Sequence, residues 1–117
     1  MSIRPTIYSR IDRQAIRVMY EIIYTESVFQ DLRELRADKR AKILDSIEEQ
    51  LTYEPTKATR NKKILVNLVP PWEYIEPIWE LRVDEYRAFY DVNEEDASVT
   101  VRAIRHKPPH KTTEEIL

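Results

Sequence analysis

The segment IWELRVDEYRAFYDV, residues 78–92, restricts the fold of this chain more than any other stretch. Two runs of alternating apolar and polar residues are separated by one acidic pair, and alternation with a period of two is typical of β-strands. If Val83 pairs with Tyr86 across a two-residue turn, Arg82 lies directly opposite Arg87. The sequence therefore predicts a β-hairpin that carries two opposed arginines close to its turn.

The predicted hairpin has an apolar face and a charged face. Alternation assigns six residues to the core face: Trp79, Leu81, Val83, Tyr86, Ala88 and Tyr90. The opposite face carries Glu80, Arg82, Arg87 and Phe89. Residues 98–105 are predicted as the next strand, with Val99, Val101 and Ala103 on the core face. The same alternation then places Arg102 and His106 on the face of the two arginines.

Upstream of the hairpin the apolar period changes. Residues 17–24 are rich in β-branched and aromatic side chains and predict a strand. Helical spacing then predicts helices near 28–36 and 39–53, the first of which begins with a capping box formed by Ser27 and Gln30. The short link between the two helices predicts an antiparallel helical hairpin.

The remaining segments complete the predicted domain. Residues 56–63 are predicted as a basic loop, 64–69 as a strand and 70–77 as a loop bounded by prolines, and the proline-containing tail is predicted to be irregular. The sequence thus predicts one α+β domain over residues 18–117, a small antiparallel sheet with a two-helix hairpin packed on one face. Residues 1–17 hold four arginines and a single acid and are predicted as an N-terminal arm outside this domain.

The composition excludes several classes of site. Glycine is absent, so the glycine-rich loops that bind phosphates and dinucleotides cannot form. Cysteine is also absent, which excludes disulfides, thiolate catalysis and cysteine zinc sites and fits a cytoplasmic protein. No apolar run reaches the ~18 residues of a membrane helix, so no membrane partner is expected. The net charge of −2 gives the chain as a whole no attraction to nucleic acid.

Two opposed arginines require a counter-anion, because like charges across a sheet repel. Glu80 can supply it within an ordinary surface cluster. The alternative is an external phosphate, which arginine binds in a bidentate manner, and a face that also carries Phe89 and His106 suits single-stranded RNA. His106 and His110 are candidates for proton transfer, but their spacing does not match a metal site. We expect no metal or other cofactor.

Four segments resemble the RelE/ParE toxin superfamily of bacterial type II toxin–antitoxin modules, with the RelE-like branch as the nearest: YEIIYTESVFQDLREL, RAKILDSIEEQL, TRNKK and WELRVDEYRAFYDVNEEDASVTV, followed by RHK. The resemblance implies a toxin that cleaves mRNA without a metal, free or on the ribosome. It also implies a cognate antitoxin protein that holds the toxin inactive and provides its only contact with operator DNA. By this resemblance Arg87 contacts the scissile phosphate, Arg82 lies beside it, and His106 and Lys107 occupy a basic position at the end of the last strand.

The sequence thus yields two sets of candidate residues. The catalytic candidates are Arg87, His106 and His110. The substrate-binding candidates are Arg82, Lys62, Lys63, Arg102, Lys107 and Phe89. Two other functions remain open: a ParE-type toxin that inhibits DNA gyrase by protein contact, and a non-catalytic member that only binds its antitoxin. The non-catalytic alternative arises because Ile78 and Glu80 replace lysines of the RelE type and no tyrosine follows residue 90.

Overall fold

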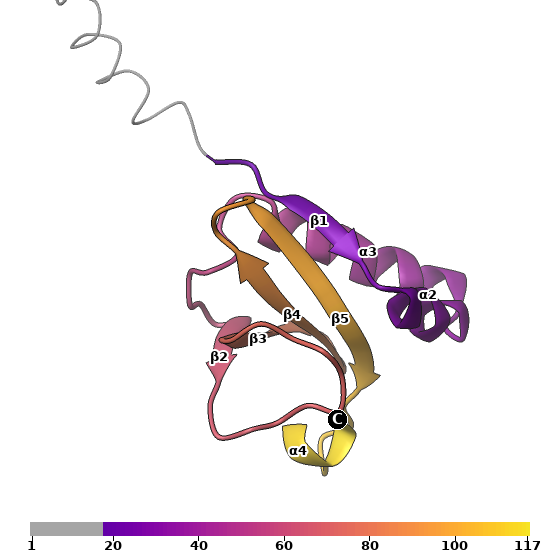
Figure 1. The fold of residues 1–117 in the computed structure, drawn as a ribbon. Helices are drawn as coiled ribbons and strands as arrows, with labels where there is room; N and C mark the ends of the chain where they lie inside the picture. Colours follow the sequence, from indigo (N-terminus) through magenta and orange to yellow (C-terminus); the bar gives the residue numbers. More distant parts are fainter. Residues whose placement is uncertain (1–17) are drawn as a thin grey trace, which may run out of the picture.

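The computed structural model describes residues 18–117, so the predicted N-terminal arm lies outside the described residues. A five-stranded sheet in the order β1-β5-β4-β3-β2 forms the centre, and helices α2 and α3 cover one of its faces (Figure 1). The strands are β1 (Glu21–Tyr24), β2 (Lys62–Leu65), β3 (Ile78–Val83), β4 (Tyr86–Asn93) and β5 (Ser98–His106). The helices are α2 (Glu26–Arg33), α3 (Ala37–Leu51) and α4 (Thr113–Ile116). The predicted α+β architecture, with a helical pair on one face of a small sheet, is confirmed.

The hairpin of β3 and β4 has the predicted register. Val83 pairs with Tyr86 and Arg82 pairs with Arg87 across the turn. The apolar face packs on the helices, where Trp79, Leu81 and their neighbours meet residues of α2 and α3. The helices contribute Val28, Leu32, Ile43, Ile47 and Leu51 to this core. Burial of side chains of this size contributes roughly 1.5–3 kcal/mol each, so this interface fixes the sheet on the helical pair.

The sheet is not wholly antiparallel, as the sequence predicted it to be. β1 runs parallel to β5, with Glu21 opposite Ser98 and Tyr24 opposite Val101. Alternation along a strand defines its faces but carries no information on the direction of its neighbour, so the pattern could not reveal this pairing.

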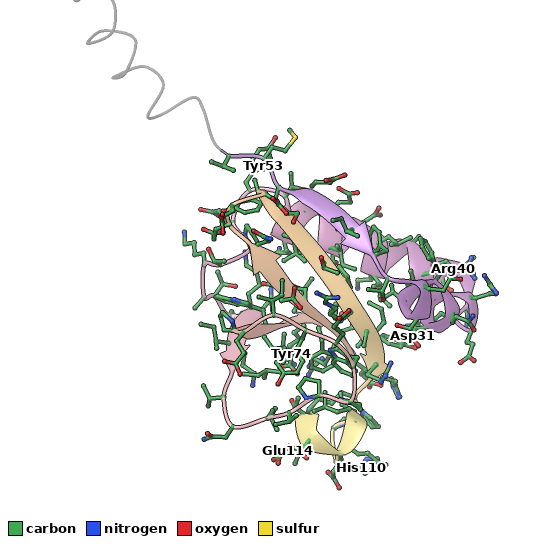
Figure 2. All side chains as sticks on the ribbon, in the orientation of Figure 1. Asp31, Arg40, Tyr53, Tyr74, His110 and Glu114 are labelled. Carbon is green, nitrogen blue, oxygen red and sulfur yellow. The ribbon has the colours of Figure 1, made fainter. Side chains whose placement is uncertain are left out.

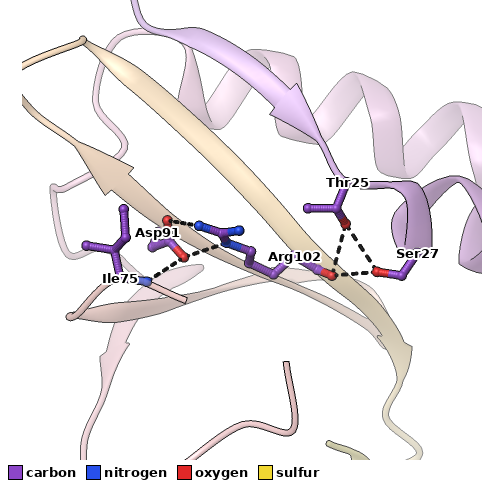
Figure 3. A network of polar contacts seen from close by, with 5 residues as sticks. All are labelled: Thr25, Ser27, Ile75, Asp91 and Arg102. Atoms are coloured by element: carbon purple, nitrogen blue, oxygen red, sulfur yellow. Dashed lines mark hydrogen bonds and ion pairs between the residues drawn. The ribbon is translucent and has the colours of Figure 1, made fainter. Parts of the chain in front are cut away.

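Side chains at the start of α2 complete the edge of β5 beyond the end of β1. The hydroxyls of Thr25 and Ser27 donate to the carbonyl of Arg102 at 3.3 and 3.2 Å, as Figure 3 shows. Asp31 Oδ2 accepts from the backbone N–H of Ile104 at 3.0 Å. The predicted capping box is therefore wrong: Thr25 is the N-cap, it makes no side-chain cap bond, and Ser27 bonds to the sheet. These contacts protect backbone groups that an edge strand would otherwise expose.

A β-bulge in β5 changes which face its last residues occupy. Phe89 pairs with Ala103 but Tyr90 pairs with Val101, so Arg102 is an extra residue on β5. Beyond the bulge Ile104 joins the core, and Ala103 lies opposite Phe89 on the other face. The predicted faces of Ala103 and Ile104 are therefore wrong. His106 pairs with Tyr86 on the helix side of the sheet, not on the arginine face as predicted.

The second face of the sheet is partly covered by the segment that links β2 to β3. Trp72 lies on Phe89, with ring centroids 5.5 Å apart, and the backbone N–H of Ile75 donates to buried Asp91 at 3.1 Å. In Figure 1 this segment and α4 lie on the side of the sheet opposite α2 and α3. The tail is thus partly helical rather than irregular. No helix in the described part of the chain is long and apolar enough to cross a membrane.

Candidate functional site

A cavity of about 240 Å³ opens on the second face, where β2, β3 and β4 meet the C-terminal tail. We call it the basic cavity. Its lining consists of Arg60, Asn61, Lys63, Glu80, Arg82, Arg87, Lys107 and Thr113. Strand pairing assembles its centre, because Lys63 lies opposite Glu80 and Arg82 lies opposite Arg87. Five basic side chains against one carboxylate leave this small space positively charged in a chain whose net charge is −2.

Arg87 is the buried cation of the basic cavity, with 8% of its surface exposed. Its Nη1 donates to the carbonyls of Asp84 and Tyr86, both at 2.9 Å. Burial lowers the pKa of Arg87, the carboxylate of Glu80 opposes that shift, and the charge of Arg82 adds to it. An arginine starts from a pKa so high that the side chain stays charged. The backbone contacts fix the guanidinium in place before any ligand binds.

Glu80 lies among these cations and is 4% exposed. Its Oε2 accepts from the hydroxyl of Thr113 at 2.9 Å and lies 3.9 Å from Arg87 Nε. Its Oε1 lies 3.6 Å from Lys63 Nζ. Glu80 therefore provides part of the expected counter-charge, as the surface-cluster interpretation requires. It cannot balance five cations, so the cavity can still take an external anion.

The structure brings four of the predicted site residues together: Arg87, Arg82, Lys63 and Lys107. Sequence reasoning missed Arg60, Asn61 and Thr113 as members of the site. The basic run around Arg60 gave a signal for that residue. No pattern in the tail indicated that Thr113 returns to the sheet.

Lys62 does not belong to the basic cavity. It lies opposite Leu81 and is 3% exposed, on the core side of β2. Its ammonium donates to the carbonyls of Gln50 and Glu54 at 2.9 and 2.6 Å and so closes the end of α3. Burial lowers the pKa of Lys62. The cation of Lys62 therefore has two structural partners and almost no exposed surface, so the structure does not place Lys62 in the substrate-binding set as the sequence analysis predicted.

Arg102 and Phe89 lie on the second face but are not open to a ligand. Arg102 Nε donates to Asp91 Oδ2 at 2.8 Å, and the two side chains are 15% and 2% exposed (Figure 3). Phe89 is fully buried beneath Trp72. The structure therefore does not present Phe89 for stacking with an RNA base as the sequence analysis predicted, and Arg102 forms an internal ion pair. Arg105 lies opposite Arg87 in the strand register, but its Nη1 lies 3.0 Å from Asp31 Oδ2 and forms an ion pair there.

Neither histidine lines the basic cavity. His106 Nε2 lies 2.9 Å from Glu85 Oε1 at the hairpin turn, and its ring is 5.2 Å from that of Tyr86. His110 is exposed in the tail beside α4, as Figure 2 shows. Among residues 18–117, no three side chains of the metal-binding types come together as a metal site would require.

Comparisons with known proteins identify the fold and the family. A family model described as "ParE toxin of type II toxin-antitoxin system, parDE" matches residues 22–107. The fold is similar to the toxin–antitoxin complex RelBE2 from Mycobacterium tuberculosis, with 22% identity, a TM-score of 0.59, and coverage of 77% of this chain and 100% of that chain. It is also similar to the archaeal RelE–RelB complex from Pyrococcus horikoshii OT3, with 21% identity, a TM-score of 0.60, and coverage of 80% and 99%. The isolated RelE toxin of E. coli matches with 19% identity, a TM-score of 0.56, and coverage of 82% and 93%. None of the curated proteins matches the sequence.

Proposed function

The chain belongs to the ParE toxin family of type II toxin–antitoxin systems, and within that family we propose that it is an endoribonuclease that cleaves mRNA, free or on the ribosome, and so inhibits translation. The observation that carries this proposal is the basic cavity. It gathers five cations around a preorganised arginine in a space of about 240 Å³, which suits a phosphate group and its nearest atoms. The enzyme works in the cytoplasm and uses no metal.

The chemistry follows from the fixed positions of the cations. Arg87 and Arg82 contact the non-bridging oxygens of the scissile phosphate, and Lys63, Arg60 and Lys107 hold the flanking backbone. Attack by the RNA 2′-hydroxyl on phosphorus increases the negative charge on the phosphoryl oxygens. Donors that are already in place stabilise that charge without reorganising, and this is a major source of catalysis in phosphoryl transfer.

An antitoxin is the second ligand of the same cavity. Two of the similar structures are complexes of a toxin with an antitoxin. In this protein an acidic antitoxin segment would compete with RNA for the five cations, and operator DNA would be reached only through the antitoxin. Co-expression with the product of the neighbouring gene tests this, and the expected result is a complex in which Lys63 is protected from chemical acetylation. A complex that leaves Lys63 reactive would place the antitoxin elsewhere.

One observation favours the other candidate functions. The described residues that line the basic cavity include no histidine, the side chain that most often transfers protons near neutral pH. Without a proton acceptor the protein would be a gyrase inhibitor of the ParE type or a non-catalytic partner of the antitoxin.

The test is mRNA cleavage in a cell-free translation extract by the wild type, Arg87→Ala and Arg87→Lys. Loss of a charge-stabilising donor typically costs on the order of 10²–10³ in rate, so both variants are expected to cleave far more slowly. Arg36→Ala is the matched control, because Arg36 pairs with Asp38 on an exposed stretch at the start of α3, away from the basic cavity. Growth arrest with intact mRNA and inhibited DNA supercoiling would identify the gyrase inhibitor. A wild type that neither cleaves RNA nor arrests growth would identify the non-catalytic member.

A further inference from the structure

Cleavage of RNA by its own 2′-hydroxyl requires a group that accepts the hydroxyl proton. In their charged form the five basic side chains of the cavity can donate hydrogen bonds but cannot accept a proton. Both histidines lie outside its lining. We infer that Glu80 is this proton acceptor and that Thr113 positions it, a role that rests on the proposed endoribonuclease activity. This departs from the sequence hypothesis, which gave proton transfer to His106 or His110.

The position of Glu80 suits an acceptor that works beside a bound phosphate. Its Oε2 is 3.9 Å from Arg87 Nε, the cation assigned to the scissile group. A hydroxyl next to that phosphate therefore falls within reach of the carboxylate. Strand β3 fixes the backbone of Glu80, and the Thr113 hydroxyl bond at 2.9 Å fixes Oε2.

The second oxygen of Glu80 is the one available to substrate. Oε1 lies 3.6 Å from Lys63 Nζ, which is beyond the usual 2.7–3.2 Å of a hydrogen bond between nitrogen and oxygen. The Lys63 side chain is 66% exposed and can swing toward a phosphate. Oε1 can then accept from the 2′-hydroxyl while Oε2 stays bound to Thr113.

The step balances without a metal or a further reactant. The 2′-oxygen forms a bond to phosphorus as its proton passes to Glu80 Oε1. The bond from phosphorus to the 5′-oxygen breaks, its electron pair stays on that oxygen, and solvent water supplies the proton that completes the 5′-hydroxyl. The products are a 2′,3′-cyclic phosphate and a 5′-hydroxyl end. The negative charge of a bound phosphate offsets the fixed cation of Arg87, and Lys63 can swing toward the phosphate oxygens. Both effects reduce the positive charge at Glu80 when the carboxylate must take a proton.

The decisive variant is Glu80→Gln, assayed under single-turnover conditions on mRNA in ribosome complexes. The amide keeps the size of the side chain and can accept from Thr113, but it cannot take a proton. The cleavage rate is expected to fall at least 100-fold while RNA affinity is unchanged or stronger, because one negative charge leaves the cavity. Glu80→Asp is expected to retain more activity than Glu80→Gln. Glu114→Gln, an exposed carboxylate of α4, is the matched control and is expected to cleave at the wild-type rate.

The pH profile separates a proton acceptor from a side chain that only neutralises charge. On the acid side of the pH profile, the logarithm of the wild-type cleavage rate is expected to fall by one for each unit decrease in pH. Thr113→Val is expected to shift this acid limb along the pH axis, because the variant removes the hydroxyl bond to the Glu80 carboxylate. A wild type that cleaves with no acid limb would overturn the role of Glu80 even if Glu80→Gln does not fold. Glu80→Gln at the wild-type rate would overturn it as well. Intact mRNA with wild-type protein would instead reject the endoribonuclease proposal itself.

Discussion

Arg82 and Arg87 show how a sheet accommodates two opposed cations. The sequence predicted two opposed arginines that repel each other and require a counter-anion. The structure has Arg82 exposed but Arg87 buried, with two backbone carbonyls and Glu80 as partners. The burial of Arg87 and its specific acceptors therefore outweigh the repulsion between the two arginines. The alternation pattern could not indicate that Arg87 would be buried.

Arg87→Ala is accordingly expected to lower the free energy of unfolding by about 1–3 kcal/mol. It leaves two partly buried carbonyl acceptors without their donor and removes a cation beside the buried carboxylate of Glu80. Urea denaturation followed by circular dichroism measures the change. Arg82→Ala is the matched control, and because Arg82 is exposed its effect should stay within about 0.5 kcal/mol. Equal stability of the two variants would show that the Arg87 contacts contribute nothing to folding.

Tyr90 makes stability depend on pH in the alkaline range. It is fully buried, its hydroxyl donates to the carbonyl of Pro55 at 2.6 Å, and burial raises its pKa above the ordinary 10.0. The unfolded chain releases this proton near pH 10 and the folded chain keeps it, so stability is complete below pH 10 and declines above it. Burial also raises the pKa of Tyr24, to about 12, which adds to the decline.

Tyr90→Phe tests this dependence. The variant is expected to lose about 1 kcal/mol at pH 8, because the hydrogen bond to Pro55 is gone. Above pH 10 its stability should fall less steeply than that of the wild type, by up to ~1.4 kcal/mol per pH unit. Urea denaturation at half-unit steps from pH 8 to 11 measures both slopes, with Tyr74→Phe as a variant that removes a tyrosine outside the core. Parallel curves for wild type and Tyr90→Phe would contradict the assignment.

At the scale of elements, the turns of this chain form without glycine. Within residues 18–117, three residues adopt positive φ angles, Asn67 at 58°, Asp84 at 53° and Ala97 at 51°. Asparagine and aspartate tolerate this region better than other side chains do. Ala97 does not share that advantage, since its Cβ crowds the backbone with no polar group to compensate. The β4–β5 turn is therefore the strained connection of the sheet.

Ala97→Gly is expected to stabilise the protein by about 0.5–1 kcal/mol, because relief of the left-handed conformation exceeds the added entropy of the unfolded chain. Ala41→Gly provides an internal control with the opposite sign. Ala41 lies on the exposed side of α3, where glycine costs about 1 kcal/mol relative to alanine. Differential scanning calorimetry should show the two melting temperatures on opposite sides of the wild type. A lower melting temperature for Ala97→Gly would contradict the strain.

The elements also show how far the sequence could be interpreted. The β3–β4 register was predictable, because a two-residue turn and strict alternation fix it together. The bulge at Arg102 was harder to predict, because VTVRAIR alternates as far as Ala103 and only the adjacent apolar pair Ala103-Ile104 departs from that pattern. The residues that line the basic cavity were likewise only partly predictable. The positions of Arg82 and Arg87 follow from the pattern of the hairpin. Thr113 depends on the path of the tail, which contacts far apart in the sequence determine.

At the scale of the whole molecule, the basic cavity concentrates positive charge on an otherwise acidic protein. Binding of an uncleavable 2′-O-methyl RNA is therefore expected to weaken as salt rises, by about −0.7 in logarithmic slope for each phosphate neutralised. Lys63→Ala should reduce the magnitude of this slope by about 0.7. Lys39→Ala, on the exposed surface of α3, should leave it unchanged. Fluorescence anisotropy at several salt concentrations measures the slopes, and equal slopes for the two variants would place the RNA elsewhere.

The order of the strands also has a consequence for how the protein is made. Synthesis runs from the N-terminus, so β1 is made before the other described strands, yet its partner in the sheet is β5. Lys107 and Thr113, which line the basic cavity, follow β5 in the chain. The edge strand β1 therefore stays unpaired until β5 has been made, and the cavity lacks part of its wall until the residues after β5 have been added. Helices α2 and α3 and the β3–β4 hairpin, whose contacts are closer in sequence, can form before either of them.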